Sequence, residues 1–188
     1  DAGSTSFPQI KQLRYPITHT IGLGFVSKLQ FDPGTARLSL AYSTLLNGVS
    51  AAAAVTFDSA GAAYFFGTTL EYLSFPVLNQ LPEGGPGGGA DLVLAKLSLS
   101  QETGTLEMDY SVRIGGWGFE FANDISVDSA GAIHLAGSTV STNFPLRNNI
   151  PASRLPNANG IVMKLVPAGG SVGIAYSTLL NESVFKIA

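Results

Sequence analysis

Asp58-Ser59-Ala60-Gly61-Ala62 is the stretch that decides the fold, because it returns letter for letter as Asp128-Ser129-Ala130-Gly131-Ala132. An Asp side chain can hydrogen-bond its own backbone two residues on, and a Gly can take the positive φ that tight turns require. Each copy lies between two short runs in which apolar residues alternate with small or polar ones. This pattern predicts the same antiparallel hairpin twice, 70 residues apart.

Other landmarks repeat in the same order around this hairpin. Lys-Leu occurs three times at intervals of 68 residues, and Phe-Pro occurs three times at intervals of 68 and 69. The landmarks are Lys28-Leu29, Lys96-Leu97, Lys164-Leu165, Phe7-Pro8, Phe75-Pro76 and Phe144-Pro145. The segment Tyr-Ser-Thr-Leu-Leu-Asn at 42–47 also returns unchanged at 176–181. A period of about 68 residues therefore organises the chain.

Each repeat is predicted to contain four antiparallel strands. The third is apolar almost throughout, which is typical of a strand buried on both faces. The predicted first strands are 53–58 and 123–128, and the second strands are 62–69 and 132–139. The third strands are 25–31, 92–99 and 161–166, and the fourth strands are 38–45, 106–114 and 172–179.

These repeats predict an all-β fold, a β-propeller fragment built of four-stranded antiparallel blades. A β-sandwich would not explain the strict repeat, and a β-solenoid would need a shorter period. Residues 1–188 are expected to form a single partial propeller. Its parts are a partial blade at 1–48, blades at 49–116 and 117–183, and the start of a further blade at 184–188.

Composition excludes several function classes. The net charge is −3 with ten scattered Lys and Arg residues, so no basic stripe is present and nucleic acid is not expected as a partner. The absence of cysteine excludes disulfides and thiolate metal sites. No apolar stretch is long enough for a membrane helix, so membrane insertion is not expected. The first residue is Asp1, which suggests a chain that is processed or cut from something longer.

The chain resembles the bacterial seven-bladed β-propeller repeats, also called SBBP-type repeats. The resemblance rests on the hairpin from Val127 to Thr139, on Phe144-Pro145, on 161–165 and on 175–180, and it covers nearly the whole chain. The middle copy departs from it, because Arg113 interrupts the usual Tyr-Ser-Thr-Leu pattern. The resemblance implies a secreted or cell-surface bacterial protein, and it carries no family-wide catalytic residues.

The connections after each second strand are long, at 6–23, 70–90 and 140–159, and they should share one face with the connections between blades. Trp117 lies in such a connection between glycines, where it could stack on a sugar ring or anchor a partner. The reading that the pattern favours is that it plugs the gap between blades. Phe7, Phe75 and Phe144 are expected to pin the long loops.

Glu120, Asn123 and Asp124 stand where an innermost strand should begin. They could bind an ion or a polar ligand, although solvated channel lining is the favoured reading. The glycine-rich stretch at 84–89 lacks the lysine and the helix of a phosphate-binding loop. His134 replaces Tyr64 in a strand and is expected to be a packed side chain.

No catalytic constellation, metal site or cofactor is therefore predicted, and His19 stands by itself in a loop. The sequence favours a non-enzymatic extracellular or cell-surface scaffold, with a protein or carbohydrate ligand at the four candidate residues. Neighbouring blades of a longer chain, or other copies of this one, are further expected partners. A propeller hydrolase or lyase acting on a polysaccharide or small molecule is the alternative, with its site partly built by missing blades.

Overall fold

The computed structural model describes residues 7–13, 23–71, 73–83, 85, 87–150 and 159–187. Within these residues the chain is all-β, without a helix, as the sequence predicts, and so none of them belongs to a helix that could cross a membrane. The strands are β1 (Leu23–Asp32), β2 (Arg37–Asn47), β3 (Ala51–Phe57), β4 (Ala63–Leu70), β5 (Ala90–Leu99), β6 (Leu106–Ile114), β7 (Glu120–Val127), β8 (Ile133–Thr139), β9 (Asn159–Ala168) and β10 (Ser171–Leu180).

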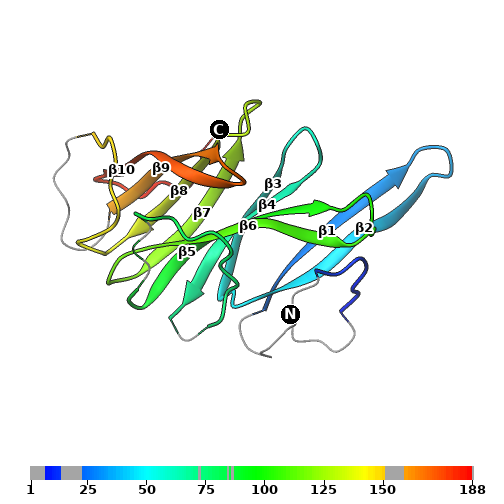
Figure 1. The fold of residues 1–188 in the computed structure, drawn as a ribbon, viewed down its shortest axis with the longest axis horizontal. Coiled ribbons are helices and arrows are strands. Elements are labelled where there is room, and N and C mark those ends of the chain that lie inside the picture. Colours follow the sequence, from blue (N-terminus) through cyan, green and yellow to red (C-terminus); the bar gives the residue numbers. More distant parts are fainter. Residues whose placement is uncertain are drawn as a thin grey trace.

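The strands form three antiparallel sheets in which chain neighbours are also sheet neighbours. The first sheet has two strands, β1-β2, and the others have four each, β3-β4-β5-β6 and β7-β8-β9-β10. The three sheets lie side by side in chain order (Figure 1). The predicted strands are confirmed within a few residues at each end, and this is the usual uncertainty of strand boundaries.

The repeated Asp-Ser-Ala-Gly segments are the turns of two equivalent hairpins, as predicted. Asp58 Oδ1 accepts hydrogen bonds from the N–H groups of Ala60 at 3.0 Å and Ala62 at 2.9 Å. Asp128 Oδ1 accepts the same two bonds, from residues two and four positions on, at 3.0 and 2.9 Å. Gly61 and Gly131 take φ values of +84° and +78°, which residues with a Cβ rarely adopt.

The middle sheet is covered on both faces, so most of the core lies against it. One face packs against the third sheet through residues such as Phe66, Leu94 and Val112. The other packs against the first sheet, where Phe65 and Leu97 meet a cluster of residues that includes Val26, Tyr42 and Leu46. Burial of these apolar faces is the main favourable term for a chain of stacked sheets.

The long connections fold back over the outermost strand of each sheet. Asn79 N donates to Ser111 O at 3.1 Å, and Arg147 N donates to Ser177 O at 3.2 Å. The rings of Phe75 and Phe144 are 7% and 2% exposed, which confirms that they pin these loops. Phe7 packs on Phe25 with ring centroids 5.0 Å apart. The loops thus cover strand edges that would otherwise expose free backbone groups.

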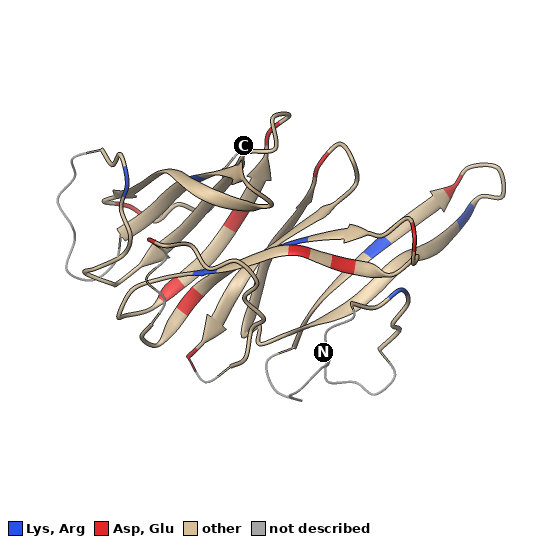
Figure 2. Ribbon diagram, viewed as in Figure 1, with Lys and Arg blue, Asp and Glu red and all other residues tan. Residues whose placement is uncertain are grey.

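Charged side chains are scattered over the described residues. Figure 2 shows Lys and Arg interspersed with Asp and Glu on all three sheets, with no strip of Lys and Arg alone. The described residues therefore offer no basic stripe that would favour a polyanion.

Candidate functional site

The connection from β6 to β7, residues 115–119, is the candidate site. It passes so close to its neighbours that two of its glycines cannot be replaced without movement. A Cβ on Gly115 would lie 1.6 Å from Asp91 Oδ1, and one on Gly116 would lie 2.6 Å from Ser141 Cβ. The glycines therefore let the backbone approach two buried side chains closely.

Three consecutive backbone N–H groups of this connection donate to side chains of the third sheet and its long loop. The bonds run from Gly116 N to Glu120 Oε2 at 2.9 Å, from Trp117 N to Asn143 Oδ1 at 2.8 Å, and from Gly118 N to Ser141 Oγ at 2.8 Å. On the other side, Gly118 O accepts the N–H of Gly89 at 2.8 Å. The connection is therefore held from both sides and has little freedom to change shape.

Trp117 projects from this fixed connection and is 78% exposed. The favoured sequence interpretation, that it plugs a gap between blades, is wrong, because the side chain is exposed rather than buried between two sheets. Phe119 and Val140, at 48% and 40% exposed, lie nearby, and Val140 N donates to Phe119 O at 3.0 Å. An exposed aromatic residue beside further apolar surface is a common feature of binding sites.

Glu120 supports the connection from inside the protein. Its side chain is fully buried, so the interpretation of this residue as solvated channel lining is wrong. Besides the bond from Gly116, Oε1 accepts the hydroxyls of Thr139 and Ser141 at 2.5 Å each. Three donors around one carboxylate offset much of the cost of burying it.

Asp91 and Arg113 form a second buried charge cluster beneath the connection. Arg113 Nε donates to Asp91 Oδ2 at 2.5 Å, and Gly87 N donates to the same oxygen at 3.2 Å. Burial raises the pKa of Asp91 to about 6; Arg113 opposes this rise, and the charge of Glu120 adds to it. Asp91 Oδ1 and Arg113 Nη2 are buried without a hydrogen-bond partner.

Asn123 and Asp124 lie further along β7, at the bulge between Ala122 and Asp124, and the structure does not bring them into the connection. Asn123 Nδ2 donates to Val184 O at 2.6 Å, and Asp124 Oδ2 accepts Ile187 N at 3.0 Å. They hold the last described residues beside the first strand of the third sheet. Residues 181–187 form no strand and Ala188 lies outside the described residues, so a further blade at 184–188 stays a prediction.

His134, a further residue considered in the sequence, lies apart from the connection. His134 Nε2 is 3.3 Å from Asp128 Oδ2, beside a hairpin turn. His19 and part of the glycine-rich stretch at 84–89 lie outside the described residues. In the described part of the chain, no three His, Cys, Asp or Glu side chains gather closely enough to hold a metal ion.

The candidate site at residues 115–119 therefore consists of the exposed indole of Trp117 and the buried side chains that hydrogen-bond to the backbone beside it.

The chain matches no known protein-family model, and a search of the curated proteins also returns no match. The fold defines an all-β protein of stacked antiparallel meander sheets.

Proposed function

We propose that this chain is part of a β-propeller of the SBBP-repeat kind, a secreted or cell-surface scaffold that binds a carbohydrate or protein partner through Trp117. The propeller is supported by the order of the sheets, each a meander packed face to face on the next. Ring closure would cover the outer faces of such a stack. The non-enzymatic role is supported by the burial of Asp91 and Glu120, whose side chains are out of reach of a substrate.

The exposed indole is the single observation that carries the binding proposal. An aromatic ring can stack on a sugar ring or fill a pocket on a protein partner. Glycine on either side leaves the faces of the Trp117 ring open. The hydrogen bonds to Glu120, Asn143 and Ser141 order the connection before any ligand arrives, which lowers the entropic cost of binding.

One observation favours the alternative of a hydrolase or lyase. Asp91 has a pKa raised to about 6, mainly by burial, and a neighbouring carboxylate in Glu120. Perturbed carboxylates of this kind recur in active sites, but structural ion pairs perturb pKa values too. Turnover of a polysaccharide by the intact chain, lost in Asp91→Asn, would establish the alternative.

A glycan array, followed by fluorescence titration, tests the binding proposal. The sequence contains one tryptophan, so intrinsic emission reports on Trp117 directly. We expect a bound glycan to shift this emission, and Trp117→Ala to abolish binding. Phe185→Ala, at a residue 73% exposed and outside the connection, is the matched control. Glycan binding that survives Trp117→Ala would refute the assignment of the site.

A further inference from the structure

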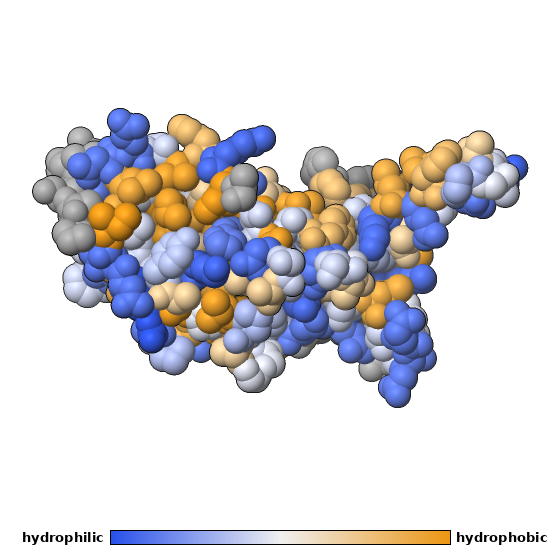
Figure 3. Space-filling model, turned by 90° about the horizontal axis from the view of Figure 1, so that it is seen from above, coloured by the Kyte–Doolittle hydropathy of each residue, from blue (hydrophilic) through white to orange (hydrophobic). Residues whose placement is uncertain are grey.

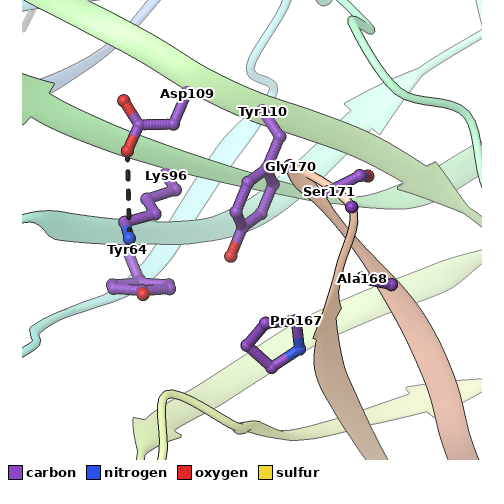
Figure 4. Close-up of a pocket in the computed structure, with 9 residues that line it drawn as sticks. Tyr64, Lys96, Asp109, Tyr110, Pro167, Ala168, Gly170 and Ser171 are labelled. Carbon is purple, nitrogen blue, oxygen red and sulfur yellow. Dashed lines mark ion pairs between the residues drawn. The ribbon is translucent and has the colours of Figure 1, made fainter.

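The middle sheet assembles a polar cluster around Lys96 near its hairpin turn. Lys96 pairs in register with Tyr64 on β4 and with Tyr110 on β6. Its Nζ lies 3.5 Å from Asp58 Oδ2 and 3.8 Å from Asp109 Oδ2, and 5.3 Å from the centroid of the Tyr64 ring. Figure 4 shows Tyr64, Lys96, Asp109 and Tyr110 along a pocket of about 300 Å³. The hairpin β3–β4 thus supplies an acid and an aromatic ring to this lysine.

The third sheet repeats the arrangement with different residues. Lys164 pairs in register with His134, and its Nζ lies 3.5 Å from Asp128 Oδ2. Asp128 is also the partner of His134. In both hairpins the Asp opens the turn, and the ring follows six residues later, as Tyr64 after Asp58 and His134 after Asp128. A lysine on the third strand is therefore matched by an Asp and a ring from the hairpin beside it.

Among the described residues, the first sheet has the lysine and the tyrosine but no such hairpin. Lys28 pairs in register with Tyr42, yet in the described part of the chain β1 is bonded to β2 alone, whereas β5 and β9 each have a strand on both sides. Tyr42 is 3% exposed, and its hydroxyl has no hydrogen-bond partner. Among the described residues Lys28 makes no ion pair; its Nζ bonds Gly61 O at 3.4 Å and lies 5.2 Å from the centroid of the Phe57 ring.

Apolar surface lies open at the same place. Val55 and Phe57 of β3 are 49% and 41% exposed on the side of the first sheet. Ile125, the counterpart of Val55 on β7, is 5% exposed, because the middle sheet covers it. A hollow of about 480 Å³ adjoins this surface and is lined in part by Lys28 and Tyr42. Figure 3 shows apolar side chains gathered on the β1–β2 end of the molecule.

We propose that the free edge of β1 and the hollow beside it bind a β-hairpin whose turn begins with Asp and which carries Tyr or His six residues later. Its second strand adds antiparallel to β1, and its first strand covers Val55 and Phe57. The Asp pairs with Lys28, and the aromatic residue gives the Tyr42 hydroxyl a polar neighbour. The hairpin comes from a stretch of polypeptide other than β3–β4 and β7–β8. Those two are already paired with β5 and β9, so a folded second copy has neither of them to offer.

A synthetic peptide of residues 120–139, which contains one copy of the motif, tests the inference with the full chain. We expect saturable one-to-one binding by calorimetry and slowed hydrogen exchange at the β1 amides that do not face β2. The change Asp128→Asn in the peptide, or Lys28→Met in the chain, should weaken binding about tenfold through loss of a partly buried ion pair. Lys164→Met in the chain is the control and should leave affinity unchanged.

A head-to-tail cyclised form of the peptide guards against failure of the linear form to make a hairpin. The inference is overturned if neither form slows exchange at β1, or if Asp128→Asn binds equally well. Protection of β1 that grows with protein concentration in the absence of peptide would also overturn it, because a second copy would then occupy the edge. Trp117 emission should not change when the peptide binds. Peptide binding at β1 can therefore be tested independently of the proposed ligand site at Trp117.

Discussion

Glu120 Oε2 and Gly116 N are joined by a hydrogen bond of 2.9 Å across four residues of chain. This bond connects the buried start of β7 to the exposed connection that carries Trp117. The other oxygen of Glu120 accepts two hydroxyls from the far end of β8 and the loop after it. The shape of the candidate site therefore depends on one buried carboxylate.

Glu120→Gln should loosen the connection. An amide keeps one accepting oxygen, so at least one of the three donors loses its partner, at a cost of about 1–3 kcal/mol. We expect a lower urea midpoint and a lower fluorescence anisotropy of Trp117 under native conditions. Glu107→Gln, on the exposed side of β6, is the control. An unchanged anisotropy in Glu120→Gln would mean that the connection does not need this carboxylate.

Gly115→Ala should destabilise the chain strongly, because its Cβ would lie 1.6 Å from Asp91 Oδ1 and 2.6 Å from Glu120 Oε2. Both oxygens belong to buried side chains, and moving these side chains would break the hydrogen bonds of Asp91 Oδ2 and Glu120 Oε2, so we expect a loss above about 3 kcal/mol. In the control Gly173→Ala, the nearest atom to the new Cβ is 3.9 Å away. Equal urea midpoints for the two variants would contradict the close approach.

The two acids Asp91 and Asp128 should affect stability in opposite directions with pH. The pKa of Asp91 is raised from 3.8 to about 6, chiefly by burial, so its favourable contribution is complete below about pH 4 and is lost as the pH rises through 6. The pKa of Asp128 is lowered to about 2, first by the Ala132 N–H and then by His134. Its contribution is present above about pH 4 and is lost as the pH falls toward 2.

Urea midpoints of the unmodified chain, Asp91→Asn and Asp128→Asn between pH 7 and pH 2 measure these contributions. From pH 7 to pH 4 the urea midpoint of the unmodified chain should rise relative to that of Asp91→Asn. The unmodified chain should be more stable than Asp128→Asn down to about pH 4, and this difference in stability should shrink below that pH. Parallel curves for all three proteins would show that neither pKa is shifted.

Tyr42→Phe should stabilise the free chain by about 1 kcal/mol, because it removes a buried hydroxyl without a partner. Tyr110 has the same place in β6, but its hydroxyl is not among the buried groups without a partner, so Tyr110→Phe should not stabilise. Thermal unfolding of the two variants gives the comparison. Destabilisation by Tyr42→Phe would show that the Tyr42 hydroxyl has a partner.

The sequence predicts the strands well because hairpin chemistry is local. The turn needs an Asp that accepts two N–H groups and a Gly with positive φ, so the same Asp-Ser-Ala-Gly segment recurs in each copy. The alternation of apolar residues then reveals which strand faces pack together. These features depend on neighbours in the chain, so a single sequence suffices to find them.

The site is predicted less well because its contacts are long-range and differ between copies. Asp91 and Arg113 are 22 residues apart in the chain, and Glu120 and Ser141 are 21 apart. Arg113 could have been singled out from the sequence, because a charged residue stands there where the other copies have Leu45 and Leu179. The exposure of Trp117 could not be predicted, because a tryptophan between glycines is compatible both with burial between two sheets and with an exposed connection.

An experimental structure of the chain tests the central claim most directly, through superposition of β3–β6 on β7–β10. We predict that a rotation of about 45–90°, with almost no shift along its axis, relates the two sheets, as four to eight blades per ring require. The same operation should carry β1–β2 onto β5–β6. A large shift along the axis, or a different operation for the second pair, would contradict a propeller.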